Sequence, residues 1–427
     1  MTVAVTYQNL YQSLCYRTRH TPNALALVYE QRRYSFSVFH QRVIQVMAQL
    51  STVWKLNKGD RIILGWGNTP AFCELFYAAM GLGIVVVPFS TKLKQDEGRS
   101  LLDHIAPRAV FYDSDGQNWL AQCATARCVS LGEWQDIKLP ETYPAAGKAP
   151  VYAQDTAVIM FTSGTTGLPK GAMITHGNLL CAVDAYANAL HLTARDSTVL
   201  AVPIYHITGL SALLALFMHL GATIYLHKRF NADAVVTAIR QHNITFLHGS
   251  PTVFILLCQA IKNSALNNPD VPPESYPSLR SIACGAGHLN QGLIKELTEI
   301  FPHSDIHPVY GLTETSSPAT IFRDDIRHSD KINSSGRAIP GVEIVIRDDR
   351  RHDLLVGQIG HIWLRGDVVI KQYWQGDANQ NESFDQGWFY SGDLGYLDED
   401  GYLFIKDRSK DMINRGGEKY ILLSWKI

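Results

Sequence analysis

A glycine-rich stretch at residues 161–178, with the sequence FTSGTTGLPKGAMITHGN, constrains the fold of this 427-residue chain more than any other segment. It follows an apolar run at 157–160, which predicts a buried strand, and it precedes an amphipathic stretch at 179–190, which predicts a helix. The sequence therefore predicts a loop that connects a strand to a helix.

The composition of this loop suits a phosphate group. Its glycines lack Cβ atoms, so the backbone can adopt positive φ angles and present N–H groups closely to an anion. Hydroxyl side chains add hydrogen-bond donors, and a lysine adds a mobile positive charge. The residues concerned are Ser163, Gly164, Thr165, Thr166, Gly167, Lys170 and Gly171. The sequence therefore predicts a cradle for a nucleotide phosphate.

The spacing of the loop excludes a Walker A motif, G-x-x-x-x-G-K-[ST]. Here Gly164 and Gly167 are too close together, and Gly171 follows Lys170. The string TSGTTGLPKG instead resembles the signature of adenylate-forming enzymes, which include acyl- and aryl-CoA ligases, luciferases and peptide-synthetase adenylation domains. A purely structural glycine-rich loop is the alternative, and the ten-residue match disfavours it.

Strand and helix signals alternate on both sides of this loop. Short strand-like runs lie at 61–66, 84–89, 198–202, 222–226, 244–247, 279–283 and 305–309, and helical segments separate them. From residue 336 onward, short alternating strands are punctuated by Gly and Asp. The predicted fold class is α/β, with two helix-covered, mostly parallel sheets and a small antiparallel β subdomain at about 336–406. Polar residues 115–147 predict a loop region between sheets.

A second motif, YGLTET, follows the strand predicted at 305–309. A carboxylate beside a phosphate is repulsive unless a divalent cation lies between them, so Glu314 is predicted to bind Mg²⁺ and Thr313 to donate to the α-phosphate. Glu314 considered alone would be a solvated loop acid. The hexapeptide resembles the second signature of the same family, which implies that Tyr310, next to Gly311, lines the adenine.

The motif YSGD at 390–393 and the motif DRSKD at 407–411 resemble the ribose site of the family. The resemblance implies that Asp393 accepts hydrogen bonds from the ribose hydroxyls and that Arg408 contacts the same sugar. A plain β-turn is the alternative for the Gly-Asp pair.

Two further segments resemble parts of the family that border the acyl pocket. His206 in PIYHITG is predicted to contact the substrate carboxylate or the channel to it, and a core histidine is the alternative. Gly285, Ala286 and Gly287 in CGAGHL would allow a flat ring close to the backbone. No Asp lies near His206 to pair with an α-amino group, which argues against an amino-acid substrate.

The predicted site comprises catalytic, cofactor-binding and metal-binding residues. The catalytic residues are Lys170, His206, Thr313 and Glu314. The cofactor-binding residues are Thr162, Ser163, Gly164, Thr165, Thr166, Gly167, Lys170, Gly285, Ala286, Gly287, Tyr310, Gly311, Thr313, Asp393 and Arg408, and Glu314 is the Mg²⁺ ligand. The resemblance implies ATP and Mg²⁺ as cofactors and CoA as co-substrate. A carboxylate would attack the α-phosphorus of ATP, pyrophosphate would leave, and the acyl-AMP would pass its acyl group to CoA.

Composition narrows the class of partner. The 38 Lys and Arg residues balance 39 Asp and Glu residues, so nucleic acid is not an expected partner. The seven cysteines lack metal-ligand spacing and favour a cytoplasmic protein, and the longest apolar stretch, at 212–226, is interrupted by His219, so no transmembrane segment is expected. The expected partners are a small carboxylic acid, ATP and CoA, with an acyl carrier protein as another acceptor.

The resemblance extends from residue 21 to about residue 419. It implies an AMP-binding domain over 1–406, and a hinge with a remnant of the C-terminal lid domain over 407–427; the lid is otherwise expected to be absent. Because that domain supplies a further lysine in the family, the chain is expected to bind ATP or acyl-AMP but to turn over poorly. The alternatives are a free-standing adenylation domain that loads a carrier protein, and a non-catalytic nucleotide or acyl-adenylate binder.

Overall fold

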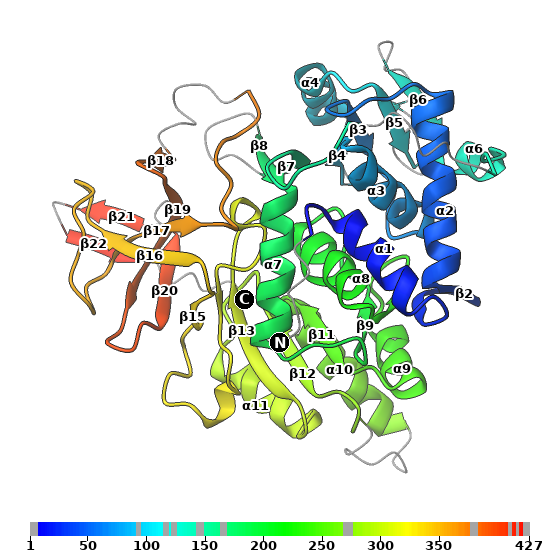
Figure 1. Cartoon of the computed structure of the whole chain (residues 1–427). Coiled ribbons are helices and arrows are strands. Elements are labelled where there is room, and N and C mark those ends of the chain that lie inside the picture. The colour runs from blue at the N-terminus through cyan, green and yellow to red at the C-terminus, as the bar shows by residue number, and fades with distance from the viewer. Residues whose placement is uncertain are drawn as a thin grey trace.

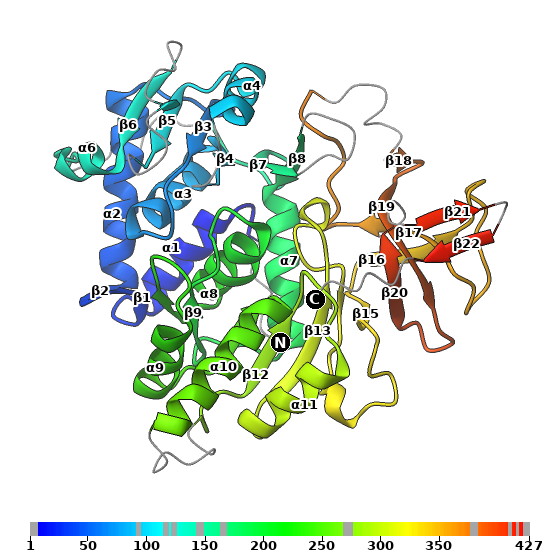
Figure 2. The ribbon, with the colours of Figure 1, turned by 180° about the vertical axis from the view of Figure 1, so that it is seen from behind.

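Three sheets surround the long helix α7, His176–Ala189, in the computed structural model of the chain (Figure 1). The structure describes residues 7–90, 95–113, 119–120, 126–141, 149–162, 169–267, 276–375, 383–408, 412–415 and 418–421. Seen from behind, α7 again lies between the sheet that contains β3, β5 and β6 and the sheet that contains β16, β17 and β20 (Figure 2). Among the described residues, no helix is both long and apolar enough to cross a membrane.

The first sheet is parallel except at one edge. Its strands are, in spatial order, β6 Arg127–Ser130, β5 Ala109–Tyr112, β3 Arg61–Leu64, β4 Val85–Pro88, β7 Thr156–Thr162 and β8 Lys170–Thr175. The associated helical segments are α2 Phe36–Ala48, η1 Gln49–Val53, α3 Pro70–Leu82, α4 Gln95–Ile105 and α6 Leu131–Asp136. α3 begins where the Thr69 side chain accepts a hydrogen bond from the Phe72 N–H, and it ends at Gly83, whose φ of 68° suits glycine. The strands predicted at 61–66 and 84–89 are thus confirmed.

The glycine-rich stretch joins two strands, so the predicted strand-to-helix loop is wrong in this respect. β7 and β8 are antiparallel, and Thr162 lies opposite Lys170 in their register. The residues after the loop form a strand in which Ala172 and Ile174 face the core, while Met173 and Thr175 are less buried. α7 begins only after β8, where the Thr175 side chain caps it.

The second sheet is larger and has a parallel centre. Its strands are, in spatial order, β15 Arg337–Ala338, β14 Thr320–Ile321, β13 Asp305–Tyr310, β12 Ser281–Cys284, β11 Phe246–Gly249, β9 Ser197–Leu200, β10 Thr223–Leu226, β1 Leu25–Tyr29 and β2 Arg32–Ser35. Its other helical segments are α1 Leu10–His20, η3 Thr208–Ala215, α8 Leu216–Leu220, α9 Ala232–His242, α10 Pro251–Asn267, α11 Gln291–Ile300, η4 Thr313–Thr315 and η5 Ile326–His328. The five strands predicted after the glycine-rich loop are confirmed here, within about two residues.

The third sheet is antiparallel, as predicted from the change of pattern after residue 336. It contains β16 Val342–Arg347, β17 Gly360–Gly366, β18 Phe384–Asp385, β19 Trp388–Leu397 and β20 Leu403–Arg408. A separate hairpin pairs β21 Met412–Arg415 with β22 Glu418–Ile421. The α/β fold class with two mainly parallel sheets and an antiparallel sheet is therefore confirmed.

Asn68, between β3 and α3, joins the two large sheets. Its side chain is buried, and its Nδ2 lies 3.0 Å from the carbonyl of Val202 and 3.1 Å from that of His227. Its Oδ1 accepts a hydrogen bond of 2.9 Å from the Ile204 N–H. Because these bonds satisfy backbone groups in the interior, they fix the segment that carries His206 against the first sheet.

Candidate active site

Glu314 lies where the first and second sheets meet. It belongs to η4, directly after β13, and its Oε1 accepts a hydrogen bond of 3.0 Å from the Tyr373 hydroxyl. The same oxygen lies 3.4 Å from the hydroxyl of Thr162, the last residue of β7. The structure thus brings Glu314 to the end of the strand that enters the glycine-rich loop.

Lys170, the first residue of β8, also contacts Tyr373. Its Nζ is 5.3 Å from the centroid of the Tyr373 ring, which is within the range of a cation–π contact. Thr162, Lys170, Glu314 and Tyr373 are named here the Glu314 cluster. Because the first two residues flank the loop and the third follows β13, the cluster joins the two predicted signatures.

The surroundings of Glu314 favour the arrival of a cation. Burial raises the pKa of its carboxyl above the usual range, while hydrogen bonds from its local backbone, Tyr373 and Thr162 and the charge of Lys170 oppose that rise. A divalent cation would stabilise the buried carboxylate directly. Oxygen donors of this kind are those that Mg²⁺ prefers, so the residues present fit the ion.

The third sheet contributes Asp393. This residue lies in β19, is buried, and accepts a hydrogen bond of 2.7 Å from the hydroxyl of Tyr310 at the end of β13. Arg408 lies opposite Asp393 in the register of β19 and β20; only its backbone is described. The predicted adenine residue and both predicted ribose residues therefore come together at one place.

The segment 285–287 follows β12 and lies against the end of β13. A Cβ atom added to Gly285 would be 3.1 Å from the Val309 carbonyl oxygen and 3.5 Å from Cε1 of His248. Ala286 has a φ of 57° and is exposed, as is Gly287. Gly311 is similarly restricted, because a Cβ atom there would be 3.1 Å from Cα of Pro318. Both glycines are therefore closely packed against neighbouring backbone, and the approach of a flat ring to residues 285–287 stays a prediction.

The remaining predicted residues are His206, Thr313 and the loop residues 163–167. His206 is exposed, its ring lies 4.7 Å from that of Tyr205, and among the described residues no hydrogen bond joins it to the Glu314 cluster. Thr313 lies beside Glu314 in η4 and is half-buried. Five predicted phosphate ligands, Ser163, Gly164, Thr165, Thr166 and Gly167, lie outside the described residues.

Sequence reasoning missed Tyr373. The residue lies after β17 in the string IKQYW, which carries no charge pattern or glycine spacing that would mark a site. Its contact partner Glu314 is 59 positions earlier in the chain. Only the folded arrangement identifies it.

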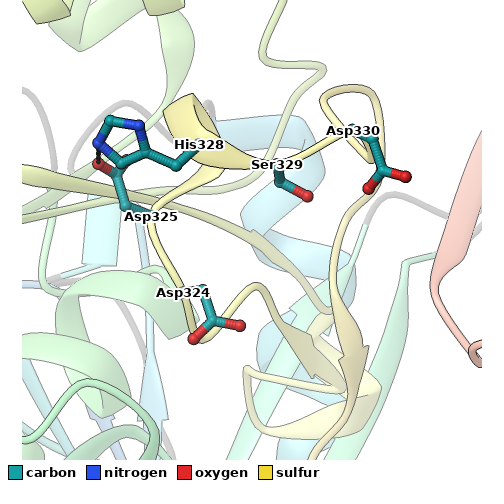
Figure 3. A pocket seen from close by; sticks show the side chains of 5 residues that line it. All are labelled: Asp324, Asp325, His328, Ser329 and Asp330. Atoms are coloured by element: carbon teal, nitrogen blue, oxygen red, sulfur yellow. Dashed lines mark ion pairs between the residues drawn. The ribbon is translucent and has the colours of Figure 1, made fainter.

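An acidic pocket elsewhere in the chain is not a metal site. Asp324, Asp325, His328, Ser329 and Asp330 line it, after β14 and around η5 (Figure 3). Its carboxylates are spread along the loop, and Asp325 forms an ion pair with His328 at 3.5 Å. Within the described part of the chain, no group of three or more His, Cys, Asp or Glu residues could hold a metal ion.

Two buried histidines predict a loss of stability in acid. Burial lowers the pKa of both His176 and His248 from 6.5 to about 4. Between these two values the unfolded chain binds protons that the folded chain does not, so stability falls as the pH falls through this window. Each histidine should lower the free energy of unfolding by up to about 1.4 kcal/mol per pH unit.

Chemical denaturation at about pH 7 and about pH 5 measures this effect. His248→Gln should weaken the pH dependence relative to the unsubstituted chain, whatever its effect on stability at neutral pH, because glutamine does not titrate. An identical pH dependence in the two proteins would contradict the assignment.

This combination of fold and site defines an adenylate-forming ligase, an enzyme that uses ATP to activate a carboxylic acid. A family model described as AMP-binding enzyme matches residues 16–374, so the chain belongs to this family. The match includes the glycine-rich loop, Glu314 and Tyr373. Ligases of this family use ATP, Mg²⁺ and CoA.

Individual relatives of the chain are named as CoA ligases. The chain is 33% identical over 411 residues to the 2-succinylbenzoate–CoA ligase of Bacillus velezensis, covering 95% of this chain and 79% of the relative. It is 31% identical over 386 residues to the long-chain-fatty-acid–CoA ligase FadD13 of Mycobacterium tuberculosis, covering 87% of this chain and 73% of that one. The o-succinylbenzoate CoA synthetase of Bacillus subtilis in complex with the acyl-adenylate OSB-AMP superposes with a TM-score of 0.84, at 29% identity, over 98% of this chain and 81% of that one.

Proposed function

We propose that this chain activates a fatty or aryl carboxylic acid with ATP, releases pyrophosphate and forms an acyl-AMP, whose acyl group then passes to CoA. The observation that supports it is the convergence of Lys170, Glu314 and Thr162 at the two ends of the glycine-rich loop. The relatives named for 2-succinylbenzoate and for long-chain fatty acids support an acid of one of these two types.

In this proposal each group of residues has one task. Lys170 and the loop residues 163–167 bind the phosphates, and Thr313 donates to the α-phosphate. Asp393 and Arg408 bind the ribose, and Tyr310 and Gly311, with residues 285–287, border the adenine. His206 borders the path of the carboxylate. Mg²⁺, held by Glu314, would neutralise charge on the phosphates when bound.

The reaction would depend mainly on the positioning of two anions. A carboxylate and a triphosphate repel one another, so the chain must supply positive charge and N–H donors where they meet. Lys170 and the loop backbone supply these groups on one side, and the buried Asp393 orients the nucleoside on the other. The absence of an Asp near His206 supports an acid without an α-amino group.

A panel of carboxylic acids tests the proposal. It should contain 2-succinylbenzoate, other aryl acids and fatty acids of increasing length, each assayed for ATP-dependent pyrophosphate release and for CoA thioester. The panel should be run on this chain and on a fusion, at the predicted hinge near residue 407, to the C-terminal part of the Bacillus velezensis ligase. At least one acid should release pyrophosphate and form CoA thioester in at least one of the two proteins.

Three outcomes separate the alternatives. Thioester formation with CoA supports the ligase, whereas transfer only to a carrier protein would support a free-standing adenylation domain. ATP binding without AMP formation for any acid, in both proteins, would indicate a non-catalytic binder.

A further inference from the structure

The segment 370–374, between β17 and β18, forms backbone hydrogen bonds with Glu314 and with Gly171, which follows Lys170. The Ile370 N–H donates a hydrogen bond of 2.8 Å to the carbonyl of Glu314. The Trp374 N–H donates one of 2.7 Å to the carbonyl of Gly171, next to Lys170. Residues 370–374 are therefore fixed at one end to the loop of Glu314 and at the other end to β8.

The side chain of Tyr373 also contacts both sides of the site, Glu314 and Lys170. Its hydroxyl donates to Glu314 at 3.0 Å, and its ring faces the ammonium group of Lys170 at 5.3 Å. The side chain is 7% exposed, and a β-bridge to Ala172 fixes its backbone.

The tyrosine contacts two groups of opposite charge. Among the described residues, no ion pair within 4.0 Å joins Lys170 to Glu314. In an interior of low dielectric such charges attract strongly, and a direct pair would have to open before either could bind a ligand. A phenol offers each charge a weaker contact: a hydrogen bond to the carboxylate and a ring face to the ammonium.

We propose that Tyr373 is a positioning residue for the activation step: it holds Glu314 and Lys170 apart, so that the carboxylate can bind a divalent cation and the ammonium can bind phosphate. This inference rests on the proposed function, because it assumes that Mg²⁺ and ATP bind at the Glu314 cluster. It adds to that function the residue that keeps the two charges available.

Calorimetric titration of ATP without any acid, at excess and at limiting Mg²⁺, tests the inference without requiring turnover. In the unsubstituted chain, Mg²⁺ should tighten ATP binding. In Tyr373→Phe the carboxylate loses its phenolic donor while the ring remains, so the tightening by Mg²⁺ should fall by on the order of tenfold.

A matched control is Tyr276→Phe. Tyr276 is also buried; its hydroxyl accepts a hydrogen bond of 2.8 Å from Arg240, and its ring lies 4.9 Å from the Arg240 guanidinium carbon. The substitution removes the same atoms in a similar setting away from the site. It should leave the effect of Mg²⁺ on ATP binding unchanged.

The background Glu314→Gln distinguishes positioning from general packing. If Tyr373 acts through the carboxylate, Tyr373→Phe should have no effect on the affinity for ATP at excess Mg²⁺ in that background. An equal loss of this affinity in both backgrounds, or no loss in either, would overturn the inference and leave the proposed function intact. A lack of ATP binding by the unsubstituted chain would overturn both.

Discussion

Glu314→Gln is expected to slow acid-dependent pyrophosphate release by on the order of a hundredfold and to remove the Mg²⁺ dependence of ATP binding. The side chain keeps its size but loses the charge that would hold the cation. Because burial raises the pKa of Glu314, the rate in the unsubstituted chain should also fall in acid at a pH above the ordinary glutamate range, and the variant should lack this limb.

Glu296→Gln provides the matched control. Glu296 lies on α11 and forms a surface ion pair of 2.7 Å with Lys262. It makes the same chemical change away from the site and should leave both measurements as they are. Full activity with unchanged Mg²⁺ dependence in Glu314→Gln would exclude this carboxylate as the metal ligand.

Asp393→Ala should weaken ATP binding by on the order of a hundredfold, because a buried carboxylate that accepts hydrogen bonds from ribose hydroxyls contributes a charge-assisted bond for each. Asp393 is 5% exposed and holds the Tyr310 hydroxyl at 2.7 Å, so its geometry is set before any ligand arrives. Calorimetric titration with ATP and with AMP measures the loss, which should be similar for the two nucleotides because they share the ribose.

Asp196→Ala separates this effect from a loss of stability. Asp196 is also buried, pairs with Arg280 at 2.8 Å, and directly precedes β9, an inner strand of the second sheet. Its removal should lower the unfolding temperature, yet the folded protein should bind ATP normally. Equal ATP affinity in Asp393→Ala and in the unsubstituted chain would refute the ribose assignment.

The two main sheets were predictable because buried parallel strands appear in sequence as short apolar, β-branched runs. The run IVVV before Phe89 is an example, and its strand is fully buried. β8 was missed because its residues belong to the signature that was read as a loop. Its alternation is short, and only pairing with β7 reveals it.

The region 115–147 shows a signal that was present but unused. It was predicted as a loop, whereas β6 and α6 lie within it. Ser130 and Glu133 form a capping box: the Glu133 N–H donates to Ser130 Oγ at 3.2 Å, and the Ser130 N–H donates to Glu133 Oε2 at 2.7 Å. The S-x-x-E pattern typical of a helix start could have identified α6.

Some residues of the candidate site were likewise predictable from the sequence, and others were not. Glu314, Asp393 and Lys170 were predictable from motifs, because charge and glycine spacing mark them in the sequence. The role of Tyr373 and the sheet-joining bonds of Asn68 were not, since each depends on partners far away in the chain. Long-range contacts between single polar side chains leave no local period to detect.

Lys170 lies in the first sheet, Asp393 lies in the third, and Glu314 lies in η4 after β13 of the second, so no fragment limited to one sheet can present the whole set. ATP binding would therefore require all three sheets to be folded, and a partly folded chain would not bind ATP. A ligand that contacts all three sheets would bind only the native state. It would therefore make the three sheets unfold in a single transition.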